Sequence, residues 1–250
     1  MRDSDHRIDR ALPWIGFFGL VLLAWGAVFL MQVPAGTKWA NICGSDSGSV
    51  GFLSLFFMWS VMSAAMMAPT FVPTLATYQN LGRAGAGSAP GFAGLVAGYL
   101  LVWGIFSGVA AFVQQALAGA GLLDDAGASL SLWLSALLLA LAGGYQFSRL
   151  KDACLTQCRV PLMFFMAHWR AGPVGALHMG ARLGLACLGC CWALMTLAFV
   201  GGVMNLVWMG IALVLMVLEK LPQAGRRVTR PLGTGLLVAA LGLVLVARFS

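Results

Sequence analysis

The sequence predicts an all-α membrane protein, a polytopic bundle of about seven transmembrane helices with a cytoplasmic N-terminus. Of its 250 residues, 60% are hydrophobic and only 9% are charged, whereas soluble domains are about one quarter charged. Mean hydropathy is +0.90, and apolar runs of the roughly 20 residues that cross a bilayer fill most of the chain. We therefore expect a single integral membrane domain over residues 1–250.

Seven apolar runs make up the expected bundle, after a charged cytoplasmic tail at residues 1–11. The runs cover residues 12–32, 50–75, 91–117, 130–147, 183–203, 204–218 and 232–247. A straight helix over the fifth and sixth runs together would be about 54 Å long, against a hydrocarbon core of about 30 Å. We expect the chain to reverse there, at Gly201, Gly202 and Asn205; one long tilted helix would instead leave six spans.

Basic residues lie almost entirely on one side of this arrangement. With seven spans, all Lys and Arg residues except Lys38 and Arg248 fall on the side of the N-terminus. Positive charge marks the cytoplasmic side of a membrane protein, so we expect a bacterial inner-membrane protein with its C-terminus outside. Topology and the surrounding lipid bilayer thus explain the net charge of +7, and no nucleic-acid partner is expected.

Small residues and cysteines recur at helical spacing. Glycine pairs four residues apart predict close approach of helix backbones in lipid, and these pairs are Gly94 and Gly98, Gly104 and Gly108, and Gly180 and Gly184. The longest cytoplasmic connection, residues 150–175, is expected to be a loop with an interfacial apolar stretch. It contains the pair Cys154 and Cys158.

A second cysteine group lies in the fifth run. On a helix, one face would carry Cys187, Cys190, Cys191 and Met195. If this helix enters the membrane near Arg182, the three thiols lie roughly 7–14 Å along its axis from that point. Both cysteine groups then belong to the cytoplasmic half, where five sulfurs are expected to meet.

Sulfur ligands favour soft metal ions such as Cu(I) or Zn over Mg, Ca or Mn. We predict a site for Cu(I) or another soft metal ion, with Zn as the alternative, and its ligands are Cys187, Cys190, Cys191, Cys154, Cys158 and Met195. Secondary ligands are expected among Met58, Met62, Met66, His168 and His178. We expect Asp152, Arg159 and Arg182 around the site. Asp152 would orient a ligand, and the two arginines would contribute positive charge.

Simpler interpretations apply to the same residues. Methionine and free cysteine also fill apolar gaps between helices. We expect Asp152 to pair with Lys151, and Glu219 with Lys220, as end-of-helix pairs near the headgroups. Cys43, alone in the first outer loop, is interpreted as incidental or intermolecular.

Three functions are compatible with the thiols. The first is handling or transport of Cu(I), with a metal chaperone or a larger membrane complex as partner. The second is a membrane thiol/disulfide oxidoreductase that uses Cys187 and Cys190. The third is an accessory subunit with no metal or with a structural Zn held by thiolates. Hydrolase and phosphate-binding motifs are absent from the sequence, so catalysis would require the thiols or their metal, and no catalytic residue is assigned.

The chain resembles a bacterial family of predicted metal-binding integral membrane proteins, a domain of unknown function. The resemblance lies in residues 58–67, 150–161, 187–192, 202–208 and 219–220. It implies a metal site at the cysteines; family members often have a His before the second loop cysteine, where this chain has Gln157. The vicinal pair Cys190 and Cys191 is also similar, in its placement alone, to membrane mercury-uptake proteins.

Overall fold

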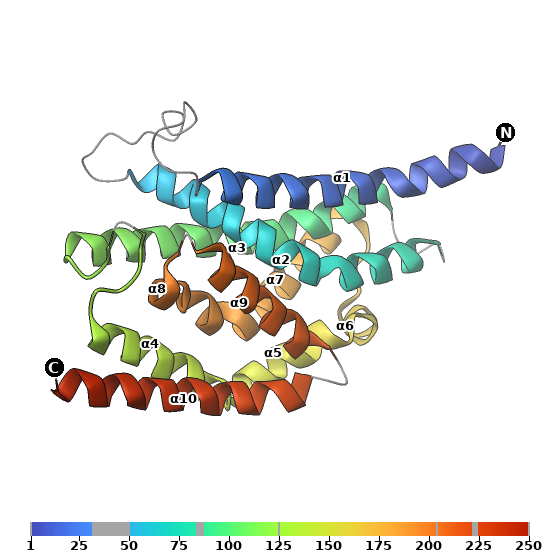
Figure 1. Cartoon of the computed structure of the whole chain (residues 1–250). Coiled ribbons are helices and arrows are strands. Elements are labelled where there is room, and N and C mark those ends of the chain that lie inside the picture. The colour runs from blue at the N-terminus through green and yellow to red at the C-terminus, as the bar shows by residue number, and fades with distance from the viewer. Residues whose placement is uncertain are drawn as a thin grey trace.

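The computed structural model describes residues 2–31, 51–83, 88–124, 126–203, 205–221 and 225–249. These residues are almost entirely helical, which confirms the predicted all-α class (Figure 1). The helices are α1 (Arg2–Met31), α2 (Phe52–Arg83), α3 (Ala89–Gly119), α4 (Leu132–Tyr145), α5 (Arg149–Arg159), α6 (Pro161–His168), α7 (Gly172–Thr196), α8 (Ala198–Gly201), α9 (Leu206–Lys220) and α10 (Gly225–Phe249).

Several helices have the dimensions that a membrane requires. Within the described ranges, four helices are long and apolar enough to cross a bilayer, over Phe52–Gly82, Ala89–Gly119, Gly172–Gly201 and Arg227–Phe249. Phe18–Leu30 and Leu132–Tyr145 form shorter apolar segments. The remaining long element, α9, has 15 residues and a length of about 22 Å, which is less than the hydrocarbon thickness of about 30 Å.

The segment predicted as a long loop is helical instead. Residues 150–175 lie mostly in α5, in α6 and in the first turn of α7, which begins at Gly172 with Pro173 in its first turn. Proline is favoured there because that position needs no N–H donor. The fifth apolar run was expected to begin at residue 183, whereas its helix, α7, begins at Gly172, so the expected start is wrong. Cys187 lies about 22 Å along the α7 axis from Gly172.

The chain reverses where the sequence predicts it. Gly202 has φ +92°, a conformation that glycine adopts readily. The side chain of Asn205 then caps α9 by accepting from the N–H groups of Val207 and Trp208. Figure 1 shows α9 running back along α7, so the last turn of α9 comes close to the cysteines of α7.

Helices α3 and α7 form the closest pair in the bundle. A Cβ atom at Gly98 would overlap the carbonyl oxygen of Leu177, and one at Gly180 would overlap that of Leu95. Gly94 likewise lies against the backbone of α7. The predicted close packing is thus confirmed for these glycines, whereas nothing lies within 4 Å of a Cβ atom at Gly104.

Helix α1 contacts α2 at a carbonyl group that a proline has left free. Pro69 lies inside α2 and has no N–H to donate to the carbonyl of Ala65, four residues earlier. The indole Nε1 of Trp25 donates to that oxygen at 3.1 Å. The break in the α2 ladder therefore provides the polar contact that joins these two helices.

Candidate metal centre

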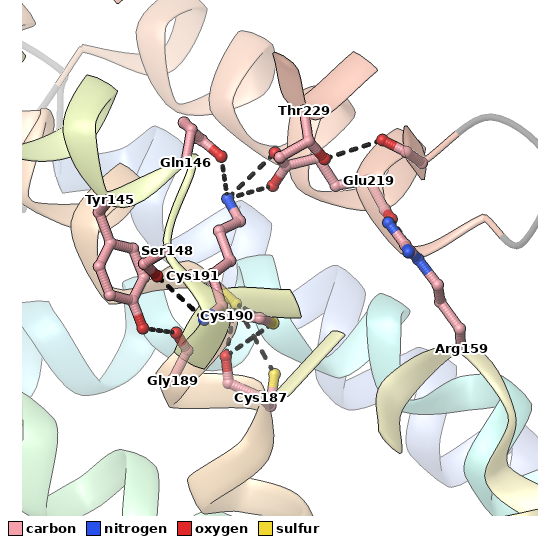
Figure 2. Close-up of polar contacts among 12 residues, drawn as sticks. Tyr145, Gln146, Ser148, Arg159, Cys187, Gly189, Cys190, Cys191, Glu219 and Thr229 are labelled. Atoms are coloured by element: carbon pink, nitrogen blue, oxygen red, sulfur yellow. Dashed lines mark hydrogen bonds and ion pairs between the residues drawn. The ribbon is translucent and has the colours of Figure 1, made fainter. Parts of the chain in front are cut away.

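Three buried thiols on α7 form the centre of the candidate site. The Sγ atoms of Cys187, Cys190 and Cys191 all lie within 4.8 Å of one another, and each residue is at most 3% exposed. Cys190 and Cys191 donate to the carbonyl oxygen of Cys187 at 3.0 and 2.7 Å. We call these three residues the thiol cluster (Figure 2).

A thioether from α2 completes a triangle of sulfur atoms with two of these thiols. The Sδ atom of Met67 lies 3.8 Å from the Sγ atoms of both Cys187 and Cys191, which are 3.9 Å apart. Dividing a side of about 3.8 Å by √3 puts the centre about 2.2 Å from each sulfur, close to the Zn–S bond length of about 2.3 Å. The triangle therefore has the size that a trigonal soft ion needs.

Met67, next in the chain to the predicted ligand Met66, is the methionine whose sulfur contacts the thiols. Met58, Met62 and Met66 are buried in the hydrophobic core. They lie on successive turns of α2 and share one face of this helix. Met67 is one position further along the chain, about 100° around the helix, and it is this sulfur that contacts the thiols. Met195 is also buried in the core, one turn beyond the thiol cluster.

A lysine from the last turn of α9 supplies positive charge to the thiol cluster. The Nζ atom of Lys220 donates to Cys187 Sγ at 3.1 Å and to Thr70 Oγ1 at 2.8 Å. The hydroxyl of Tyr99 lies 3.1 Å from the same sulfur. The expected pairing of Lys220 with Glu219 near the headgroups is wrong, because consecutive helical side chains point in different directions.

Glu219 forms a buried ion pair with α5 instead. Its carboxylate accepts from Lys151 Nζ at 2.8 and 3.0 Å, and the two side chains are 2% and 1% exposed. Lys151 also donates to Gln146, and Arg159 donates twice to the backbone carbonyl of Glu219, as Figure 2 shows in part. The expected pair of Lys151 with Asp152 is therefore wrong, and Asp152 is exposed.

The cysteines of α5 lie against the same face of α7. Cys154 and Cys158 pack against the buried core that includes the thiol cluster, and a Cβ atom at Gly189 would lie 2.6 Å from Cys154 Sγ. Both α5 residues are partly exposed, unlike the thiol cluster. The structure thus brings the two predicted cysteine groups together, with Cys154 and Cys158 on the more accessible side.

The α5 thiols should resist alkylation at neutral pH. Hydrogen bonds to Cys187 and Cys190, together with burial, raise the pKa of Cys158 well above 9.0, and burial raises the pKa of Cys154 above 9.0 as well. Because the thiolate is the reactive form, we expect half-maximal iodoacetamide labelling of both residues above pH 9.0 in the metal-free protein. Peptide mapping by mass spectrometry measures this, with detergent-denatured protein as control, and rapid labelling at pH 7 would contradict it.

Among the described residues, no hydrogen bond joins His168, His178, Arg159 or Arg182 to a sulfur atom. His168 and His178 each contact a carbonyl oxygen one turn earlier in their own helix. Arg182 is exposed on α7, and Arg159 is bound to the backbone of α9. Cys43 lies outside the described residues.

Comparison with known proteins gives one finding of substance. The model of the PpoB2 family, described as a copper chaperone, matches residues 56–243. The match includes Met67, both cysteine groups and Lys220. No curated protein and no solved structure matches the chain.

Proposed function

Because the chain belongs to the PpoB2 family of copper chaperones, we propose that it is an inner-membrane protein that binds Cu(I) as cargo and passes it to a partner. The sulfur triangle of Met67, Cys187 and Cys191 carries this proposal. Its three edges of 3.8, 3.8 and 3.9 Å suit a trigonal ion. The binding site would be the triangle itself. Its sulfurs come from α2 and α7, two of the helices that are long and apolar enough to cross a bilayer.

The chemistry of the donors supports a soft metal ion. Thiolate and thioether sulfurs select Cu(I) over hard ions. The carboxylate of α9, that of Glu219, is held by Lys151 and is not free to act as an oxygen ligand. Zn remains the alternative ion, for which Cys190 would supply a third thiolate.

A series of sulfur atoms leads from the triangle toward the partly exposed side of α5. Cys190 Sγ lies 3.3 Å from Cys191 Sγ. Cys154 and Cys158 of α5 pack against the core that includes the thiol cluster, with Cys154 Sγ beside Gly189. Cu(I) can move between such sulfurs by exchanging one ligand at a time, without release as a free ion. We propose that Cys158, followed by Cys154, exchanges the ion with a partner such as a soluble metal chaperone or a larger membrane complex.

Cu(I) competition between the purified protein and a chromogenic chelator, without oxygen, tests the proposed site. We expect Cys191→Ser to weaken Cu(I) binding about 100-fold, equivalent to about 2.8 kcal/mol, and Met67→Leu to weaken it about tenfold, equivalent to about 1.4 kcal/mol. Met66→Leu is the matched control, since Met66 is equally buried but is not part of the triangle. It should bind Cu(I) as the wild type does.

Other outcomes of this experiment would contradict the proposal. Unchanged Cu(I) affinity in a Cys187→Ser, Cys191→Ser double variant would exclude the triangle as the site. Absence of Cu(I) binding together with reversible loss of two free thiols would favour a thiol/disulfide oxidoreductase instead.

A further inference from the structure

The charges around the thiol cluster leave one lysine without a carboxylate partner. Lys151 and Glu219 neutralise each other in a buried pair. Lys220, next to Glu219 in sequence, donates only to Thr70 and Cys187 among the hydrogen bonds of the described residues. A positive charge beside buried sulfurs is costly unless a negative charge balances it. Among the described residues, the site therefore carries an excess of one positive charge in any state in which all of its thiols are protonated.

Copper binding would remove this imbalance. When Cu(I) binds to Cys187 and Cys191, two S–H bonds break, two protons leave to solvent, and two Cu–S bonds form without any change of oxidation state. The thioether of Met67 adds no charge. Two thiolates and one monovalent cation sum to a charge of −1, and the Lys220 ammonium brings the total to zero.

Resting on the proposed function, we propose that Lys220 determines the charge of the ion that the triangle accepts. Its ammonium, 3.1 Å from Cys187 Sγ, favours a monovalent soft ion because it balances the bis-thiolate complex. A divalent ion on the same two thiolates would give a neutral complex, and Lys220 would then leave a net charge of +1 in a buried site. Lys220 is thus a specificity-determining residue that does not itself bind the ion.

The test must prevent a divalent ion from recruiting a third thiolate. Cys190 lies 3.3 Å from Cys191 and Cys158 packs against the core that includes the thiol cluster, so either could add a negative charge to bound Zn(II). The comparison is therefore made in a Cys158→Ser, Cys190→Ser background, which keeps the triangle. In this background Cu(I) and Zn(II) affinities are each measured by competition with a chelator of known affinity.

Substitution of Lys220 by Leu, which removes the charge without adding a sulfur donor, should move the two affinities in opposite directions. We expect Cu(I) binding to weaken about tenfold and Zn(II) binding to strengthen about tenfold, each equivalent to about 1.4 kcal/mol. Lys220→Arg keeps the charge and should preserve the selectivity. Thr70→Val removes the hydrogen bond to Lys220 but not its charge, so it controls for local repacking and should also preserve the selectivity.

Each remaining outcome would overturn the inference. If Lys220→Leu lowers both affinities together, or changes neither, the lysine has a structural role or none. If Lys220→Arg behaves like Lys220→Leu, charge is not the determinant. Failure of the proposed function is distinguishable, because the background protein with Lys220 intact would then bind no Cu(I) at all.

Discussion

Replacement of Glu219 by Gln should destabilise the protein by about 3–5 kcal/mol, the usual effect of leaving one member of a buried ion pair without its partner. The Lys151 ammonium is 1% exposed and would keep only uncharged acceptors, Gln146 and the amide oxygen introduced at position 219. Lys151→Met should destabilise to a similar extent, because it leaves the carboxylate buried and unpaired. Thermal and chemical unfolding in detergent would measure both effects.

Two further variants identify the cause of this loss. In a Lys151→Met, Glu219→Leu double variant both charges are gone, so we expect most of the stability to return. Asp152→Asn changes an exposed carboxylate on the same helix and should alter stability by less than about 0.5 kcal/mol. Wild-type stability of Glu219→Gln would show that the ion pair does not hold α5 against α9.

An alanine at Gly98 should destabilise the α3–α7 pair by about 3 kcal/mol, the upper end of the range for overpacking. The reason is that the new Cβ atom would overlap the carbonyl oxygen of Leu177, which belongs to backbone and cannot rotate away. Gly104→Ala, on the same helix, meets nothing within 4 Å. It should instead stabilise α3 by about 0.5–1 kcal/mol through the higher helix propensity of alanine.

The opposite signs make this pair of variants informative. Both change glycine to alanine in α3, so a general effect on helix formation would shift both unfolding midpoints upward. A stabilised Gly98→Ala protein would mean that α3 and α7 lie further apart than the structure places them.

Local patterns in the sequence were sufficient to predict several features. Glycine and asparagine at positions 201, 202 and 205 predicted the reversal before α9, because a positive φ and an N-cap each have a residue signature. Spacing of three and four residues predicted the shared face of Cys187, Cys190 and Cys191. These features depend on neighbours within one or two turns of the same helix.

Contacts between helices were not predictable in the same way. Lys151 and Glu219 are 68 positions apart, so their pairing depends on how α5 packs against α9. Each was expected to pair with its chain neighbour, although side chains one position apart on a helix do not face each other. That rule could have excluded both wrong pairs, but it would not have identified the correct partners.

Arg182 caused the error in the start of α7. A charged residue within an apolar region suggested that a membrane span begins there, yet α7 begins ten residues before Arg182. The exposed Arg182 side chain can extend along the helix toward water while its backbone remains in a long helix. A single charge is therefore a weaker boundary signal than the Pro173 that begins α7.

Glu219 and Lys220 are joined by one peptide bond, yet they face different helices. One side chain is anchored to α5 and the other to the sulfurs of α7. Any rotation of the final turn of α9 must therefore move both at once. Two consecutive residues of α9 thus link the thiol cluster mechanically to α5, the helix that carries Cys154 and Cys158.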